Sequence, residues 1–336
     1  MEIKAYAIME RGAVAKPFTY ARAVGADDVL VRITHRSIAT GDVQFIDNAW
    51  NDTRYPLVPS HEMVGLVEEV GSNVAELAPG DRVGIGFQLG ACFACAYCLR
   101  GVEQFCQKQT VVGVNAFGGL AEHIVVDSRF AFRLPAELDS AAAVPLFSSG
   151  LTVYSAIKHA QLVDGARVAV LGIGGLGRMA LQFLRSLGYQ ATAVSRSPDK
   201  RDVIRKLGAD YLDGTDAEAL AAQRGTYDFV LSTLNVSFDL ETYLTLLKPD
   251  GQLCLVASPA EPLSLRAGLL YDYGRRRIFG SYVGSRADVV SMLQHAAQHD
   301  IQPFLEVMPF GQLNAAIGRI RNREIQTALV LVSEGS

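Results

Sequence analysis

The sequence predicts a two-domain α/β protein in which a mostly-β part is joined to a parallel sheet with helices on both faces. The chain has 336 residues, which suits two domains of roughly 100–200 residues each. Residues 1–147 contain short runs of strand type, and from residue 149 onward runs of strand and helix type alternate. We therefore assign residues 1–148 and 284–336 to one domain and residues 149–283 to the other.

The mostly-β domain is indicated by short apolar runs at 29–33, 65–70 and 123–126. Residues typical of turns, at 79–81 and 117–119, separate such runs. A partly open barrel is one arrangement that this pattern allows.

The parallel sheet is predicted from strand-like runs at 167–173, 190–195, 227–234 and 252–258, which alternate with helical patterns. The helix after Gly174 places apolar residues on one face at three- and four-residue steps, namely Leu176, Met179, Ala180, Phe183, Leu184 and Leu187.

Helix ends and the tail complete the prediction. Gly188 ends the first helix of the parallel part, and a second helix begins with Ser197 as its cap and Pro198 in its first turn. The tail after residue 284 is expected to rejoin the first domain as a helix, a strand, a helix and a strand, at 286–299, about 305, 311–321 and 327–332.

Composition and charge exclude several classes of protein. The net charge is −4 and no long basic run occurs, so neither a nucleic acid nor an anionic membrane is indicated as a partner. The first residues lack the layout of a signal peptide, and no apolar run reaches the roughly 18 residues that span a bilayer. We expect a cytoplasmic protein, in which clustered cysteines indicate a metal rather than disulfides.

A glycine-rich turn predicts a dinucleotide site. A strand at 167–171 runs into Gly172-Ile173-Gly174-Gly175-Leu176-Gly177, and an amphipathic helix follows. In this context the first glycine permits a tight turn, the second lets a pyrophosphate approach the backbone, and the third lets helix and strand pack closely. The start of the helix offers free N–H groups to the phosphates.

The end of the next strand predicts which dinucleotide binds. An NAD site usually has an acidic residue there for the ribose 2′-hydroxyl, but this chain has Ser195, Arg196 and Ser197, with Lys200 one turn later. These side chains can donate charge-assisted hydrogen bonds to a 2′-phosphate, which favours NADP(H). In the alternative interpretation Arg196 and Lys200 only face solvent.

Four cysteines predict a structural zinc site. Cys92, Cys95, Cys98 and Cys106 lie within one short stretch, and four thiolates saturate a tetrahedral zinc ion. One zinc per chain should hold the 88–108 lobe together, because that lobe has few large apolar residues. The fifth cysteine, Cys254, lies in an apolar strand and is expected to be a core residue.

Several motifs together resemble the zinc-type medium-chain alcohol dehydrogenases, especially their cinnamyl-alcohol-dehydrogenase-like branch. The resemblance covers nearly the whole chain and rests on the cysteine lobe, the glycine turn and the segments 55–62, 80–83, 118–122 and 150–154. It implies a GroES-like catalytic domain, a Rossmann domain, an active site between them and a homodimer.

The resemblance also implies a second, catalytic zinc, and here the sequence departs from the family. The family's two cysteine ligands correspond to Ala39 and Ser148, while its histidine ligand is intact as His61. Glu62 and Asp42, which the family keeps near the metal, are present. The hydroxyl and the histidine of the family's proton relay are replaced as well, by a glycine and a glutamine at positions 41 and 44.

These changes predict chemistry that does not depend on a catalytic zinc. Hydride addition to a conjugated C=C or C=N bond needs less electrophilic help than alcohol oxidation through a metal alkoxide. The acid–base candidates are His61, oriented by Asp42, together with Thr40, Ser148 and Glu62. A relict His61–Asp42 pair that fills an old metal pocket is the alternative.

Further residues are expected around the substrate and the nicotinamide. The resemblance places Thr152 close to the nicotinamide ring, with Val256 and Ser258 at its border. Aromatic residues at positions 50, 55 and 87 would favour a flat, apolar small molecule as substrate, or serve only in packing.

Three hypotheses follow from the sequence. The first is an NADPH-dependent reductase without catalytic zinc, and the second is a zinc-dependent alcohol or aldehyde dehydrogenase with a non-standard metal site. The third is a non-catalytic protein that binds NADPH.

Overall fold

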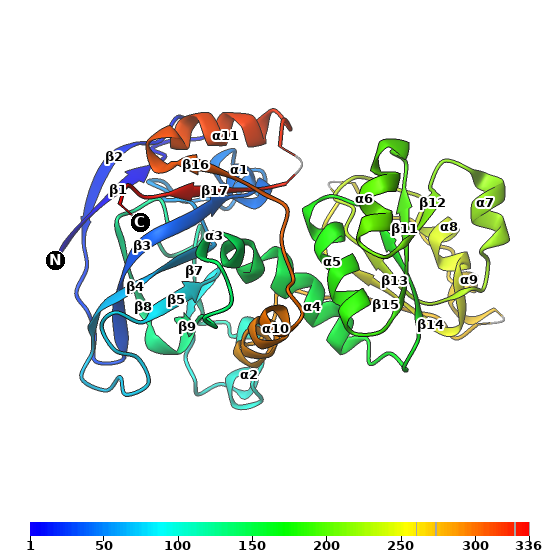
Figure 1. Cartoon of the computed structure of the whole chain (residues 1–336), viewed down its shortest axis with the longest axis horizontal. Helices are drawn as coiled ribbons and strands as arrows, with labels where there is room; N and C mark the ends of the chain where they lie inside the picture. The colour runs from blue at the N-terminus through cyan, green and yellow to red at the C-terminus, as the bar shows by residue number, and fades with distance from the viewer. Residues whose placement is uncertain (260, 273, 326, 336) are drawn as a thin grey trace. The chain divides into compact units, whose positions relative to one another are not determined.

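The computed structural model describes residues 1–259, 261–272, 274–325 and 327–335. The chain forms two compact units, one made of Met1–Ser148 with Ser285–Ser336 and the other of Ser149–Gly284. Figure 1 shows the mostly-β first unit and the layered second unit.

The first unit is built around one long strand, β3 (Asp28–Ile38), in a seven-stranded sheet. Six strands follow the order β16-β17-β3-β4-β5-β9. Strand β4 pairs with one edge of β3, while the other edge is shared between β8 and β17. The strands of this unit are β1 (Glu2–Ala7), β2 (Lys16–Ala21), β3, β4 (Met63–Val70), β5 (Arg82–Ile85), β6 (Gln88–Gly90), β7 (Thr110–Val111), β8 (His123–Asp127), β9 (Phe132–Arg133), β16 (Leu305–Pro309) and β17 (Ala328–Val332).

Alternation along β3 supplies side chains to two apolar cores, because successive residues of a strand point to opposite faces. Leu30 packs in the core with the N-terminal hairpin and the last helix, whereas Val29, Val31 and Ile33 pack in the core with β4, β5 and β8. The helices of this unit are α1 (Thr40–Ile46), α2 (Ala96–Leu99), α3 (Ser140–Ala143), α10 (Arg286–Gln298) and α11 (Leu313–Arg321).

The second unit is the predicted parallel sheet, with the strand order β12-β11-β10-β13-β14-β15. Every neighbouring pair in it is parallel, and Figure 1 shows helices on both sides of the sheet. The elements are α4 (Ser149–His159), β10 (Arg167–Leu171), α5 (Gly175–Ser186), β11 (Gln190–Ser195), α6 (Arg201–Lys206), β12 (Asp210–Asp213), α7 (Ala217–Ala222), β13 (Tyr227–Ser232), α8 (Leu240–Thr245), β14 (Leu247–Leu255), α9 (Gly268–Tyr271) and β15 (Arg277–Gly280).

The apolar face predicted for α5 is largely correct. Met179, Ala180, Phe183 and Leu184 are buried, while Leu176 and Leu187 at the two ends of the face are half-buried. Cys254 is fully buried in β14, as predicted for a core residue. The fold class predicted from the sequence is therefore confirmed.

Ser197 and Pro198 are at the predicted cap and first-turn positions, but the predicted side-chain cap is not formed. Pro198–Lys200 form one turn of 3-10 helix, and the Ser197 side chain accepts no capping hydrogen bond. Instead, the Ser197 N–H donates to Ser195 Oγ at 3.2 Å, and α6 starts later, at Arg201. The proline fixes the first turn, and the Lys200 N–H donates to the Ser197 carbonyl at 3.2 Å instead of to the Ser197 side chain.

A buried arginine fastens the C-terminal strand to β3. Arg36 is fully buried and donates from Nη1 to Ser333 Oγ at 2.9 Å and from Nη2 to the Ile33 carbonyl at 2.8 Å. Its guanidinium also lies 4.2 Å from the centre of the Phe310 ring. Burial lowers the pKa of Arg36 to about 9, so the group remains charged at neutral pH.

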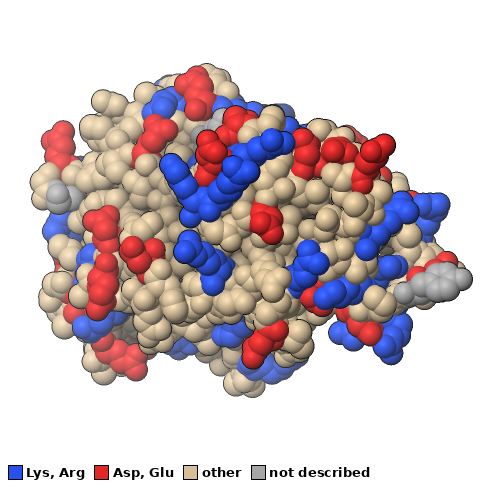
Figure 2. Space-filling view, turned by 45° about the vertical axis from the view of Figure 1, so that its right-hand side comes forward, with Lys and Arg blue, Asp and Glu red and all other residues tan. Residues whose placement is uncertain are grey.

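The distribution of surface charges and the hydropathy of the helices are consistent with the low net charge and the short apolar runs of the sequence. On the face shown in Figure 2, Lys and Arg side chains are interspersed with Asp and Glu. Among the described residues no single helix is long and apolar enough to cross a bilayer, although one bent pair, 140–147 with 149–159, meets the length and composition together.

Gly65 on β4 should not tolerate a side chain. A Cβ atom at this position would lie 2.3 Å from the Arg32 carbonyl oxygen, which is backbone of the paired strand and cannot move aside. We expect Gly65→Ala to lower the free energy of unfolding by about 1–3 kcal/mol, measured by thermal or urea unfolding. Gly318→Ala on α11 is the matched control, because a Cβ there meets no atom within 4 Å. An equal effect of the two substitutions would contradict this packing argument.

Candidate functional site

The glycine-rich turn has the geometry that a dinucleotide site needs. Gly172 has φ of +86°, a conformation that side chains rarely adopt, and α5 begins directly after Gly174. A Cβ atom at Gly177 would lie 2.0 Å from the Gly172 carbonyl oxygen, so the helix approaches the strand too closely for any side chain. At Gly174 and Gly175 the space is open, which leaves the backbone accessible to a phosphate.

A cavity of about 660 Å³ lies at the end of β11 in the second unit. It brings together five of the predicted cofactor residues, namely Gly172, Ser195, Arg196, Ser197 and Lys200. Ser195 is buried, whereas Arg196 is exposed and Lys200 is half-buried. Neither cation forms a salt bridge with a described residue, so both guanidinium and ammonium groups are available to an anionic ligand.

The sequence prediction missed other residues that line this cavity. Gly214 and Thr215 follow β12, and Phe238 follows β13. The Gly214 N–H donates to the Ser195 carbonyl at 3.1 Å, which fixes this loop beside the end of β11. A predicted strand at β12 would have located this loop, because the carboxyl ends of parallel strands meet at one edge of the sheet, but its four residues are too few to show strand periodicity.

The remaining predicted cofactor residues lie in the same unit but outside this cavity. Thr152 is buried in α4, Val256 is half-buried directly after β14, and Ser258 is exposed. The Val256 N–H donates to the Ser232 carbonyl at 3.1 Å, so the backbone after β14 follows the end of β13.

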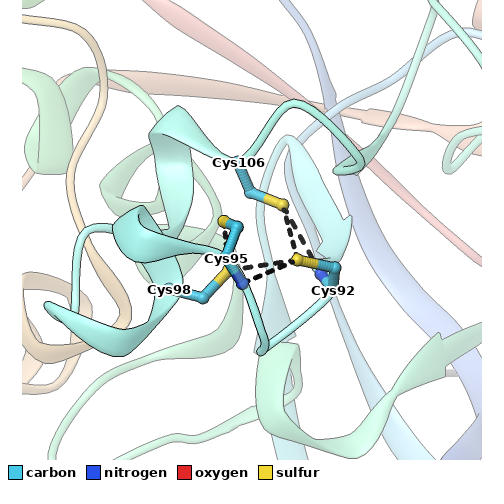
Figure 3. Close-up of side chains that lie close together, drawn as sticks. All are labelled: Cys92, Cys95, Cys98 and Cys106. Carbon is cyan, nitrogen blue, oxygen red and sulfur yellow. Dashed lines mark hydrogen bonds between the residues drawn. The ribbon is translucent and has the colours of Figure 1, made fainter.

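The four cysteines form a compact cluster in the first unit (Figure 3). Their sulfur atoms all lie within 4.8 Å of one another. The distances are 3.5 Å for Cys92–Cys106, 3.6 Å for Cys95–Cys98 and 3.9 Å for Cys92–Cys98. A tetrahedral zinc ion with bonds of about 2.3 Å requires sulfur atoms about 3.8 Å apart, so the cluster fits this ion.

Backbone groups around the cluster favour thiolates. The Cys95 N–H points to Cys92 Sγ at 3.4 Å, and the N–H groups of Ala94 and Cys95 lower the pKa of Cys92 to about 6. Burial raises the pKa of Cys98 to about 12. A divalent cation would ionise all four thiols, since coordination to zinc deprotonates a thiol outright. Among the described residues, this is the only group of three or more acidic, His or Cys side chains that could hold a metal.

A second constellation joins Asp42, His61 and Ser148 in the first unit. His61 Nδ1 lies 2.9 Å from Asp42 Oδ1, and His61 Nε2 lies 3.4 Å from Ser148 Oγ. Asp42 also accepts hydrogen bonds from the backbone N–H groups of Ser60 at 2.8 Å and Ala39 at 2.9 Å. The carboxylate therefore fixes the start of α1, the loop before β4 and the orientation of the imidazole.

The His61 imidazole of this Asp42–His61–Ser148 group is in its charged, doubly protonated form at neutral pH. Burial by itself would lower the pKa of His61, but the charge of Asp42, its hydrogen bond and the charge of Glu62 act in the opposite direction. The net effect raises the pKa of His61 to about 9. Since Asp42 occupies Nδ1, the proton on Nε2 is directed toward Ser148.

The other acid–base candidates are placed differently. Glu62 is buried and accepts a short hydrogen bond from Ser37 Oγ. Thr40 is exposed at the first position of α1. A Cβ atom at Gly41 would lie 3.5 Å from His61 Cε1, so the position of the family's relay hydroxyl does adjoin the imidazole.

Of the three aromatic candidates, one is seen next to His61. The Phe87 ring stands edge-on to the imidazole, with 6.3 Å between ring centres. Trp50 instead packs against Phe45 at 4.8 Å, and the Tyr55 hydroxyl donates to the Ile46 carbonyl at 2.9 Å. Trp50 and Tyr55 thus have packing roles in this unit, whatever else they contact.

Together these features define a class of protein. A mostly-β unit with a four-cysteine metal lobe, joined to a parallel-sheet unit with a glycine-rich phosphate turn, is the architecture of a two-domain zinc-binding dehydrogenase.

Comparison with known proteins identifies the family. Residues 25–136 match the alcohol dehydrogenase GroES-like domain, and residues 175–298 match the zinc-binding dehydrogenase domain. An aldehyde reductase of Synechocystis is 38% identical over 98% of this chain and 98% of its own length. A probable cinnamyl alcohol dehydrogenase of Oryza sativa subsp. japonica is 36% identical over 95% of this chain and 92% of its own length.

Solved structures agree. A cinnamyl alcohol dehydrogenase from Sorghum bicolor superposes with a TM-score of 0.92, 33% identity and coverage of 99% of this chain and 98% of the other. The protein CAD from Helicobacter pylori, solved in complex with NADP(H), superposes with a TM-score of 0.91 and 28% sequence identity. The match covers 100% of this chain and 99% of the other. The chain belongs to the zinc-binding alcohol dehydrogenase family of medium-chain dehydrogenases and reductases, in its cinnamyl-alcohol-dehydrogenase-like branch.

Loss of one cysteine should empty the metal lobe. We expect Cys106→Ser to lose one equivalent of zinc per chain, because a hydroxyl is a poor substitute for a thiolate ligand. The 88–108 lobe should then be cleaved faster by protease, as metal binding supplies much of its folding free energy. Metal analysis and limited proteolysis measure the two effects. Cys254→Ala, which removes the core cysteine, is the control and should keep the zinc; retention of zinc by Cys106→Ser would refute the site.

Proposed function

We propose that this protein is an NADPH-dependent oxidoreductase that reduces a conjugated C=C or C=N bond by hydride transfer, without a catalytic zinc. The observation that carries this proposal is the hydrogen-bonded row Asp42–His61–Ser148. By family resemblance, this pocket is where two thiolates and the imidazole would surround the catalytic metal.

The donor atoms at this pocket do not fit a zinc ion. The Ala39 side chain has no donor atom, and Ser148 offers a neutral hydroxyl in place of a thiolate. Zinc prefers thiolate and imidazole ligands, and a single imidazole nitrogen of His61 does not hold the ion at trace concentrations of free metal.

The two carboxylates of the pocket are already engaged. Asp42 uses Oδ1 for His61 and Oδ2 for the Ala39 N–H, and Glu62 Oε2 accepts from Ser37. Recruiting either carboxylate to a metal would break hydrogen bonds of a buried charged group, at a cost of about 1.5–3 kcal/mol each.

The cofactor is proposed to be NADPH, which supplies the hydride when bound. Arg196 and Lys200, which form no salt bridge with a described residue, line the cavity beside Ser195, where an NAD-specific protein usually has an acidic residue. The Helicobacter pylori relative was solved with NADP(H), which supports the same choice for this chain.

The protein's own contribution is a proton and its direction. The imidazolium of His61 holds a proton on Nε2 at neutral pH, Asp42 holds the ring in place, and Ser148 Oγ lies at 3.4 Å to receive it. Addition of hydride to a conjugated bond spreads negative charge over the acceptor, and one proton then completes the product. An isolated carbonyl gains less from this arrangement, because it lacks the Lewis acid that would stabilise an alkoxide.

Substrate shape follows from Phe87, whose ring stands beside His61 and favours a flat, apolar small molecule. The homodimeric state and the cytoplasmic location expected from the sequence remain part of this proposal, and size-exclusion chromatography tests the first of them.

A second candidate function is favoured by the relatives' names. They include an aldehyde reductase and probable cinnamyl alcohol dehydrogenases, so zinc-dependent reduction of aldehydes, with His61 and Glu62 among non-standard ligands, is the alternative. The third hypothesis, a non-catalytic protein, is set aside because the chain belongs to a family of enzymes.

We expect the purified wild-type protein to keep one chelator-resistant zinc and to reduce enals, enones or iminium ions with NADPH in the presence of a chelator.

Introducing thiolates at positions 39 and 148 should create a second zinc site. The double variant Ala39→Cys/Ser148→Cys should bind a second zinc and become sensitive to chelators, because three strong donors then face one point. Each single variant is the matched control. A wild-type protein with two zinc ions, whose aldehyde reduction stops on chelation, would favour the alternative.

The cofactor preference has its own test. We expect Arg196→Ala/Lys200→Ala to raise KM for NADPH by about tenfold or more, the effect of losing charge-assisted hydrogen bonds of roughly 1.5–3 kcal/mol. KM for NADH should stay unchanged, because NADH has no 2′-phosphate. Lys206→Ala, which removes an exposed cation on α6 outside the cavity, is the control. Equal loss of both cofactors would show that these cations do not select the phosphate.

A further inference from the structure

Two histidines stand one helical turn apart at the end of α10. His295 is in the last turn of this 13-residue helix and His299 is its C-cap. Their rings lie against each other in a tilted arrangement, with 4.3 Å between centres and an angle of 32° between planes. His299 is exposed and His295 is half-buried, so the pair opens to solvent.

The spacing accounts for this contact. Residues four apart lie on the same side of a helix, and the side chain of the later residue points back toward the earlier one. Two histidines at this spacing on one helix face are a known arrangement for binding zinc. The backbone keeps the register, because the His299 N–H donates to the His295 carbonyl at 3.1 Å.

The protonation state also suits a metal. Burial lowers the pKa of His295, and the neighbouring His299 lowers it further, so His295 is neutral at neutral pH. A neutral imidazole has one unprotonated ring nitrogen, which is the atom that binds a cation. Because each ring has two nitrogens, a hydrogen bond through one of them is compatible with metal binding through the other.

The other four histidines lack this arrangement. His61 is paired with Asp42, and His123 with Glu68 at 3.0 Å. His159 Nδ1 lies 2.7 Å from the Ser155 carbonyl oxygen, and His35 contacts its neighbour Thr34. A close pair of imidazoles therefore distinguishes the two histidines at the end of α10 from the other four.

We propose that His295 and His299 form a surface site for a divalent transition-metal ion, in which the two imidazoles supply two ligands and water supplies the others. Imidazole favours Cu²⁺, Ni²⁺ and Zn²⁺, with copper bound most tightly, and disfavours Mg²⁺ and Ca²⁺. The site is distinct from the cysteine lobe, whose four thiolates leave no open position for an exchanging ion.

The test is a titration of the full-length protein, without an affinity tag and with its lobe zinc retained, with NiCl2 in an isothermal calorimeter. We expect one saturable nickel site per chain and no saturable binding of Mg²⁺. Loss of an outer hydrogen-bond partner of a ligand weakens metal binding about 10- to 100-fold, so His299→Ala, which removes a ligand, should weaken it at least as much. His295→Gln should have the same effect.

Two controls keep the result interpretable. His123→Ala, which removes a histidine paired with a carboxylate elsewhere, should leave nickel binding unchanged. Thermal unfolding of His299→Ala without nickel should match the wild type, since its side chain is exposed. Nickel binding of unchanged affinity in both His299→Ala and His295→Gln would overturn the proposal.

The His295–His299 site also affects the interpretation of the zinc content measured for the purified protein. A zinc ion bound here raises the count for the purified protein without entering the pocket of His61. Zinc analysis of His299→Ala therefore separates an ion on α10 from an ion in that pocket.

Discussion

The geometry of the Asp42–His61–Ser148 group depends on one buried carboxylate. Asp42 accepts hydrogen bonds from the backbone of Ala39 and Ser60 and holds His61 through Nδ1, so a helix start, a loop and a ring are fixed by the same group. A buried charge is costly unless it is paired and hydrogen-bonded, and here the protonated imidazole supplies the pairing. Asp42 and His61 therefore satisfy each other inside the first unit.

Features encoded by neighbouring residues could be predicted from the sequence. The cysteine cluster lies within one lobe, the glycine turn spans six residues, and the buried face of α5 follows from helical spacing alone. Their physical causes are local, since thiolate number, backbone conformation and side-chain periodicity do not depend on the rest of the fold. At Ser197 the position of the cap was predicted correctly, but its side chain accepts no capping hydrogen bond.

Contacts between residues far apart in the sequence were harder to predict from the sequence. His61 and Ser148 are 87 positions apart, and only the family resemblance suggested that they share a pocket. The sequence contains no signal that Glu62 pairs with Ser37, or that Phe87 rather than Trp50 stands beside the imidazole. Strand β12 is too short to show periodicity, so the sequence did not predict that the loop at Gly214 lines the cavity at the end of β11.

The arginine beneath the C-terminal strand has a practical meaning for anyone who alters the chain ends. Arg36 is surrounded by carbonyl and hydroxyl oxygens and an aromatic face, and Ser333, close to the last residue, supplies one of those oxygens. A deletion that reaches Ser333 removes the acceptor of Nη1 and leaves a buried guanidinium with the carbonyl acceptors of Nη2 alone. Ser333 therefore contributes to the solvation of a charge in the interior of the first unit.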